Sequence, residues 1–254
     1  MHYLKRVLFA AGLVMAPVTS AHAGQILVDF GASGTQTTTD GSGRSWNNVT
    51  DTNDLSGSPF TLRNISNTDS GYRLSITNPV GVTNAVGFNG SNSNGTTAPT
   101  GAAATRGYPF TATGDSLYGN TVAFNGNVVQ SVELILSSLN PSETYNFDFF
   151  ASRTGAGGDN RETEYHVTGS DSAGTSVFLN ASENTGNIAS VTNIAPDSNN
   201  QIAIVIDPGP NNTNANRFFY LGVMEINSVP EPSAIALTGI VSAIGLLRRR
   251  RVGR

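Results

Sequence analysis

The residues in this chain best suited to catalytic chemistry are one serine and one histidine, which lie far apart in the sequence. Ser116 stands in the run Gly114-Asp115-Ser116-Leu117. A serine hydroxyl becomes a nucleophile when a histidine base and an orienting carboxylate accompany it. His166 is the only histidine between residues 24 and 228, and the residue three positions before it is Thr163. Catalysis by Ser116 would therefore need an unconventional base.

The run around Ser116 resembles the Gly-Asp-Ser-Leu motif of a family of esterases and lipases. That family places Asp-x-x-His near its C-terminus and also has a Gly-x-Asn-Asp block, and neither is present here. The resemblance implies a secreted esterase that uses Ser116, which we keep as an alternative. We expect instead a protein that is not an enzyme.

Carboxylates suggest two places for a metal ion. Glu162, Glu164 and His166 share one face if they lie on a strand, although a solvated face explains them as well. Asp29 and Glu225 stand near the two ends of the domain and converge if the terminal strands pair. Calcium prefers carboxylate and carbonyl oxygens, and the resemblance to jelly-roll modules given below implies a structural calcium ion, for which Asp29 and Glu225 are the candidate ligands. No other cofactor is expected.

A third acidic segment, Asp51-Thr52-Asn53-Asp54, lacks the rest of an EF-hand loop. Turns rich in Asp and Asn explain it equally well without an ion.

A ligand site is suggested by Trp46, the only tryptophan, beside Asn47 and Asn48. Sugar sites combine an aromatic face with amides that bind hydroxyl groups. The alternative is a tryptophan that fills the end of the fold.

Two arginines, Arg153 and Arg161, flank the glycine-rich loop 155–158. They could face the same ligand, or they could pair with nearby acids such as Asp159 and Glu162.

The charge of the chain argues against nucleic acid as a partner. The whole chain has a net charge of −4, but residues 24–228 contain seven arginines and 17 acidic residues, which gives −10. Nucleic-acid binding needs clustered lysine or arginine. The chain has no cysteine, so disulfides, thiol catalysis and cysteine-ligated zinc are excluded.

The N-terminus has the pattern of a secretory signal. Lys5 and Arg6 precede the apolar run 7–15, and Ala21-His22-Ala23 supplies a cleavage pattern of small residues. We expect residues 1–23 to be a signal peptide and residues 24–228 to form one domain.

The C-terminal segment 229–254 has three parts: Val229-Pro230-Glu231-Pro232-Ser233, an apolar run over 234–247, and Arg248-Arg249-Arg250-Arg251. The arginines predict retention on the cytoplasmic side. As a helix the apolar run would span only about 21–24 Å, against a hydrocarbon core of about 30 Å. Such a segment suits a transient hold in the membrane, although an ordinary tail anchor is the alternative.

This segment resembles the PEP-CTERM sorting signal of Gram-negative bacteria. The resemblance implies processing by exosortase, a membrane transpeptidase, after transient association with the inner membrane. It also implies export to the cell surface or to an extracellular matrix of exopolysaccharide.

The domain itself is expected to be all-β, because Thr, Ser, Asn and Gly dominate it and helical periodicity is absent. Short alternating runs predict about ten strands of an antiparallel sandwich. These runs are 25–30, 60–65, 72–76, 128–136, 144–150, 165–168, 176–179, 188–194, 202–206 and 217–226. The fourth and fifth predict a hairpin, and the last, apolar on both faces, predicts a central strand. Residues 31–58 and 89–104 are expected to be long loops.

The order of these parts resembles bacterial surface domains with a galactose-binding-like jelly roll. The resemblance lies in the segments 26–31, 46–48, 149–153 and 220–226. It implies a carbohydrate-binding type of fold. We therefore expect a non-catalytic surface or matrix protein that binds polysaccharide, with a purely structural envelope protein as the alternative.

Overall fold

The computed structural model describes residues 24–50, 58–77 and 87–230. The predicted signal peptide, the 51–54 segment and residues 231–254 of the predicted sorting signal lie outside these ranges. Within them, no helix is long and apolar enough to cross a membrane.

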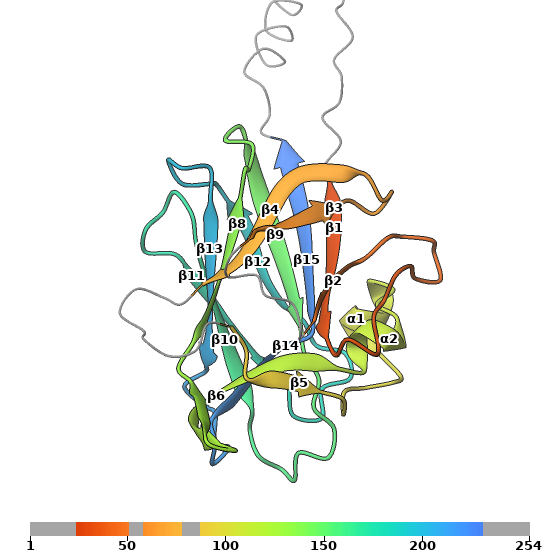
Figure 1. Ribbon diagram of the computed structural model, residues 1–254, viewed down its shortest axis with the longest axis vertical. Coiled ribbons are helices and arrows are strands. Elements are labelled where there is room, and N and C mark those ends of the chain that lie inside the picture. Colours follow the sequence, from red (N-terminus) through yellow and green to blue (C-terminus); the bar gives the residue numbers. More distant parts are fainter. Residues whose placement is uncertain (1–23, 51–57, 78–86, 231–254) are drawn as a thin grey trace, which may run out of the picture.

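The chain folds mainly into strands that form two large sheets and a smaller one (Figure 1). The first large sheet has the order β12 (Ala189–Ile194), β9 (Glu143–Phe150), β15 (Val223–Pro230), β1 (Gln25–Gly31) and β2 (Asn47–Thr50). The second has the order β11 (Thr175–Asn180), β10 (Glu162–Thr168), β13 (Ile202–Pro208), β8 (Val132–Ser137), β4 (Asp69–Thr77) and β3 (Phe60–Arg63). The small sheet contains β14 (Phe218–Leu221), β6 (Ser116–Phe124) and β5 (Gly90–Asn92), with β7 (Asn127–Val129) paired to β6. The predicted β-sandwich is confirmed in this coarse form.

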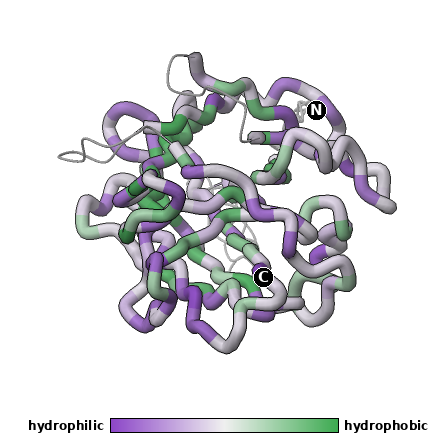
Figure 2. Tube along the Cα trace, turned by 60° about the horizontal axis from the view of Figure 1, so that its bottom comes forward, coloured by the Kyte–Doolittle hydropathy of each residue, from purple (hydrophilic) through white to green (hydrophobic). Residues whose placement is uncertain are grey.

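The core lies between the two large sheets. Strands with one buried face alternate between buried and half-buried positions, as β8 does from Val132 to Ser137. Phe149 of one sheet stacks on Tyr165 of the other with ring centroids 4.4 Å apart, and both side chains are fully buried. Figure 2 shows hydrophobic positions mainly inside the trace and hydrophilic ones mainly in the outer loops. Burial of this apolar surface is the main stabilising contribution to the fold.

The predicted hairpin between 128–136 and 144–150 is wrong. β8 pairs with β13 and β4, whereas β9 pairs with β12 and β15. The two strands therefore belong to opposite sheets, and both contribute side chains to the core between them. Alternation of apolar residues shows which face of a strand is buried, but it is the same whether two strands pair or face each other.

The predicted strand 217–226 is two strands that belong to different sheets. The chain leaves the small sheet after Leu221 and enters the first large sheet at Val223, where β15 lies between β9 and β1. The central position predicted for this segment is correct for β15. A Cβ atom on Gly222 would meet the carbonyl oxygens of Asp115 and Phe150 at 3.1 and 3.2 Å, so a larger residue at the crossing would crowd these two backbone segments.

One pair of strands also departs from the expected antiparallel arrangement. β1 and β2 run parallel, whereas the other pairs in the described ranges are antiparallel.

The outer face of the first sheet has a second, smaller core. Two short helices, α1 (Gly101–Thr105) and α2 (Phe110–Thr113), lie beside β1 and β2 (Figure 1). They help to cover a cluster that includes Trp46, Tyr108 and Phe150. The expected long loops therefore contain regular structure: β2 lies in the first, and β5 with most of α1 lies in the second.

Candidate functional site

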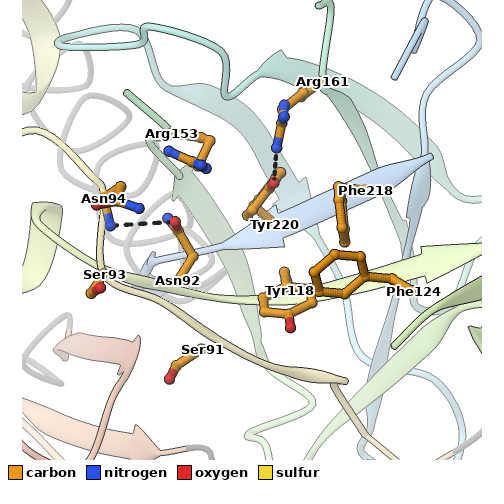
Figure 3. A pocket seen from close by; sticks show the side chains of 10 residues that line it. All are labelled: Ser91, Asn92, Ser93, Asn94, Tyr118, Phe124, Arg153, Arg161, Phe218 and Tyr220. Carbon is orange, nitrogen blue, oxygen red and sulfur yellow. Dashed lines mark hydrogen bonds between the residues drawn. The ribbon is translucent and has the colours of Figure 1, made fainter. Parts of the chain in front are cut away.

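A pocket of about 390 Å³ opens beside the small sheet (Figure 3). It is lined by Ser91, Asn92, Ser93, Asn94, Tyr118, Phe124, Arg153, Arg161, Phe218 and Tyr220. These residues come from β5 and the two positions that follow it, from β6 and β14, and from the segment that joins β9 to β10. We call this site the aromatic pocket.

One wall of the pocket is a cluster of four aromatic rings. Tyr118 contacts Phe218 edge to face, with centroids 5.4 Å apart, and Phe124 contacts Phe218 at 5.0 Å. Phe218 and Tyr220 are buried, whereas Tyr118 and Phe124 are only partly buried. The buried pair thus supports the other two rings, which keep accessible surface for a ligand. Aromatic faces of this kind can pack against the apolar face of a sugar ring.

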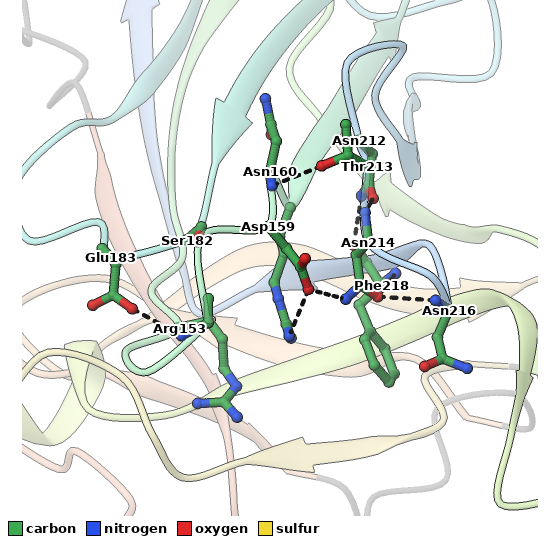
Figure 4. Close-up of polar contacts among 12 residues, drawn as sticks. Arg153, Asp159, Asn160, Ser182, Glu183, Asn212, Thr213, Asn214, Asn216 and Phe218 are labelled. Atoms are coloured by element: carbon green, nitrogen blue, oxygen red, sulfur yellow. Dashed lines mark hydrogen bonds and ion pairs between the residues drawn. The ribbon is translucent and has the colours of Figure 1, made fainter.

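Arg161 lies at the edge of this aromatic wall and is held there by three partners. Its Nη1 donates a hydrogen bond of 2.6 Å to Tyr220 Oη, and its guanidinium lies 5.5 Å from the ring centre of Phe218. Its Nη2 is 3.6 Å from the carboxylate of Asp159. Asp159 also accepts a 2.8 Å hydrogen bond from Asn214, as Figure 4 shows. Arg161 is therefore an ordered positive charge.

Arg153 is held by its backbone rather than by an acidic partner. Its N–H donates to Ala181 O at 2.7 Å, and its carbonyl accepts from Glu183 N at 2.9 Å. The side chain donates to Thr154 O. The Glu183 carboxylate instead accepts from Ala156 N at 2.8 Å, and Figure 4 shows the Arg153 guanidinium extending away from it. Across the described ranges, no carboxylate forms an ion pair with Arg153.

The third side of the pocket is polar. Asn92 is buried and donates to Ser116 Oγ and Ser152 O, both at 3.3 Å. Its own oxygen accepts from Asn94 N at 3.3 Å. The side chains of Ser93 and Asn94 are exposed at the rim. The pocket thus combines an aromatic wall with exposed polar side chains at its rim and two cations.

A second pocket of about 410 Å³ lies next to the first, and Ser93 lines both. Its other walls include Gln36, Thr97, Thr111 and Phe110. The Phe110 side chain is 62% exposed, which makes it the most exposed large hydrophobic residue in the described ranges. The two pockets together form an extended polar and aromatic surface.

Arg153 and Arg161, which the sequence predicts at a ligand site, line the same pocket in the structure. The structure does not bring Trp46 there. Trp46 is only 6% exposed, packs edge to face on Tyr108, and donates from Nε1 to Asp40 at 3.2 Å. Its ring face is therefore not accessible to a sugar, and Trp46 instead fills space in the second core on the outer face of the first sheet, not at the end of the fold.

Asn47 and Asn48 are also structural. Asn47 Nδ2 donates to Leu27 O at 3.0 Å and to Arg63 O at 2.8 Å, which ties β2 to its neighbours. Asn48 Nδ2 donates to Thr37 O at 2.8 Å. Their amide donors are used within the fold, so the predicted ligand site at 46–48 is corrected.

The terminal strands pair as the calcium prediction required, but Asp29 and Glu225 do not form a cation site. Glu225 is fully buried and accepts hydrogen bonds from Tyr108 Oη at 2.9 Å and Gln25 Nε2 at 2.7 Å. Arg106 lies 3.5 Å away and supplies the compensating charge. Within the described ranges, no three His, Cys, Asp or Glu side chains are grouped so that they could hold a metal ion. The carboxylate of Glu225 therefore does not fit the role of a calcium ligand.

Asp29 instead lies close to a second buried acid, Asp115. Oδ2 of Asp29 accepts from Thr37 N at 3.0 Å, whereas Oδ1 has no hydrogen-bond partner. Burial, and then the charge of Asp115, raise the pKa of Asp29 to about 7. Asp115 accepts from Ala32 N at 2.7 Å and from the Thr35 hydroxyl. This pair favours a proton on Asp29 at neutral pH.

Ser116 does not have the surroundings of a nucleophile. Its side chain is fully buried and its Oγ accepts from Asn92. His166 is on β10 in another sheet, where Nδ1 contacts Ser176 Oγ at 2.9 Å and Ser176 donates to Glu164 at 2.5 Å. Glu162, Glu164 and His166 do share the half-buried face of β10, as predicted. In the described residues, no histidine base accompanies Ser116.

Three residues of the aromatic pocket, Tyr118, Phe124 and Asn92, were not predicted from the sequence. Tyr118 and Phe124 belong to β6, where the run Ser116-Leu117-Tyr118-Gly119-Asn120 has no alternation of apolar and polar residues. One usable pattern was present: Phe218 and Tyr220 alternate just before Gly222, and they form the buried half of the aromatic wall.

The chain has no match among family models or among curated proteins. The enzymatically active domain of tailspike protein 4 from bacteriophage CBA120 is 12% identical over 73% of this chain, with a TM-score of 0.25. Exo-β-1,3-galactanase from Phanerochaete chrysosporium, solved with galactose, is 13% identical over 65% of this chain, with a TM-score of 0.23. The matches span only 22% and 36% of those chains, and likeness this low supports no argument about fold or function.

Proposed function

We propose that this protein is an exported, non-catalytic surface or matrix protein that binds polysaccharide through the aromatic pocket. The observation that carries the proposal is the pairing of partly exposed rings, Tyr118 and Phe124, with fixed polar groups in one concave site. Sugars present apolar ring faces and hydroxyl groups, and a site for them needs both kinds of contact. We also propose that the β-sandwich is of the galactose-binding-like jelly-roll type.

The position of the pocket agrees with attachment through the C-terminal segment. β15 begins at Val223, close to the small sheet, and ends at Pro230 on the other side of the molecule (Figure 1). Eight extended residues span about 25 Å. A chain held at its C-terminal end would therefore present the pocket away from the membrane.

The binding proposal predicts that Tyr118→Ala weakens polysaccharide binding about tenfold, because loss of a stacking ring costs about 1.4 kcal/mol. Affinity can be measured by electrophoresis through gels that contain dextran, galactan, polygalacturonate, alginate or hyaluronan. Phe178→Ala is the matched control, since this ring is 45% exposed on β11 and does not line the pocket. Equal affinities for both variants would count against the pocket. Wild-type protein that binds none of the five polymers would favour the purely structural alternative.

The sorting proposal predicts a processed product in the native host. Intact-mass analysis should show loss of residues 1–23 and of the arginines at 248–251 in the wild type. Replacement of Pro230, Glu231 and Pro232 by alanine should keep the tail and leave the protein in the inner membrane, because exosortase would no longer recognise it. Wild-type protein that keeps these arginines and stays membrane-bound would instead have an ordinary tail anchor.

A further inference from the structure

The aromatic pocket has an excess of positive charge. Both Arg161 and Arg153 act on the hydroxyl group of Tyr220: burial raises the pKa of this tyrosine, while hydrogen bonds and charge from the two guanidinium groups oppose the rise. Two like charges that converge on one group destabilise each other. In the part of the chain that the structure describes, Asp159 is the only acid that forms an ion pair at the pocket, and it does so with Arg161 alone. Arg153 is left without a counterion.

This excess contrasts with the rest of the domain, whose net charge is −10. Three of its other arginines are ion-paired: Arg44 with Asp40, Arg73 with Asp69, and Arg106 with two acids. An uncompensated arginine in a concave site of an acidic protein is best explained by an anionic ligand. The planar guanidinium group matches the geometry of a carboxylate, with which it can form two parallel hydrogen bonds.

We infer that the aromatic pocket binds an acidic saccharide, which rests on the polysaccharide-binding function proposed above. A sugar ring packed on Tyr118 and Phe124 would direct a carboxylate substituent toward Arg153 and Arg161, which line the same pocket (Figure 3). Arg161 provides a fixed charge, because Tyr220 and Phe218 hold it. Arg153 is the group that would pair with the ligand. The substrate class is therefore a polymer that contains uronic acid.

The test compares each acidic polymer with a neutral form of itself. Polygalacturonate, alginate and hyaluronan are each measured beside their carboxyl-reduced derivatives, at low and at moderate salt. We expect wild-type protein to bind at least one acidic polymer about tenfold or more tightly than its neutral derivative, because charge-assisted hydrogen bonds are the strong ones. This preference should fall as salt is raised.

Substitutions of Arg153 test whether this residue carries the preference for acidic polymers. Arg153→Gln should remove the preference. Arg63→Gln is the control and should keep it, because it also removes one positive charge but lies on β3, outside the pocket. Arg153→Lys, which keeps the charge, should retain part of the preference. Because the backbone of Arg153 makes its own hydrogen bonds, we expect these variants to fold, and thermal melting checks this.

The outcomes separate this inference from the proposed function. Equal binding of acidic and neutral forms would overturn the acidic preference and leave polysaccharide binding intact. Absence of binding to these six polymers and also to dextran and galactan would overturn both. A preference that survives Arg153→Gln would overturn the role of this arginine.

Discussion

Asp29→Asn is expected to stabilise the protein at pH 8 by up to about 4 kcal/mol, and to change its stability little near pH 4. The pKa of Asp29 is about 7 in the folded protein, against a value of 3.8 for the free side chain. Between these values the folded state binds more protons than the unfolded state, so the stability of the wild type falls as pH rises from about 4 to about 7. Asparagine resembles the protonated form at every pH and removes this loss.

The surroundings of Asp29 suit an amide. The oxygen of asparagine can still accept from Thr37 N, as Asp29 Oδ2 does at 3.0 Å. The other atom, which in Asp29 has no partner, becomes an N–H₂ donor next to the acidic Asp115. The substitution therefore replaces repulsion between two acids by a donor close to an acceptor.

Urea unfolding of the wild type and Asp29→Asn at about pH 4 and pH 8 measures the effect. Asp171→Asn is the control, since it removes the same charge from an exposed loop position. Each protein is also measured with a chelator and with added calcium. If Asp29→Asn lowered stability at pH 8, and calcium stabilised only the wild type, the charged carboxylate would be a cation ligand and our assignment of a proton would be wrong.

The composition and alternation of the sequence predicted the β-rich sandwich and the positions of most strands. They could not predict which strands pair. Val132 and Phe147 both point into the core, one from each large sheet, and a hairpin would give the same pattern. Pairing depends on contacts between residues far apart in the sequence, such as Ile226 beside Ile26 and Phe147.

The candidate site was predicted only in part, for a related reason. Arg153 and Arg161 stood out because they flank a glycine-rich loop, and the structure places both at the pocket. Trp46 drew attention because tryptophan is rare and its neighbours are polar, yet its side chain packs on Tyr108 beneath α1 and α2. Local polarity in the sequence does not show whether a loop folds back over an apolar face. The burial of Trp46 depends on α1 and α2, which are distant from it in the sequence.

Glu225, which was a predicted calcium ligand, lies beside the second core and gives the other large expected effect. Glu225 on β15 pairs with Asp148 on β9, so two acids stand side by side on the outer face of the sheet. Arg106, from the end of α1, lies 2.5 Å from Asp148 and 3.5 Å from Glu225. Burial raises the pKa of Asp148, and the charge of Arg106 opposes this rise. The Arg106 side chain thus supplies the positive charge that a calcium ion was predicted to supply.

Arg106→Gln is expected to lower the free energy of unfolding at pH 7 by about 2–3 kcal/mol. Breaking a buried ion pair costs about 3–5 kcal/mol, and water screens part of this interaction because the Arg106 side chain is 41% exposed. The change leaves the fully buried Glu225 without its counterion. Urea unfolding at pH 7 measures the loss, and Arg63→Gln on β3 is the control for removal of a positive charge.

A double-mutant cycle tests whether the loss comes from Glu225. Glu225→Gln keeps an oxygen that accepts from Tyr108, but it removes the buried charge. We expect Arg106→Gln combined with Glu225→Gln to be more stable than Arg106→Gln alone by about 1–2 kcal/mol, because neighbours that interact are not additive. Strict additivity of the two single changes would show that Arg106 stabilises the protein through packing over the outer face of the sheet, and not through its charge.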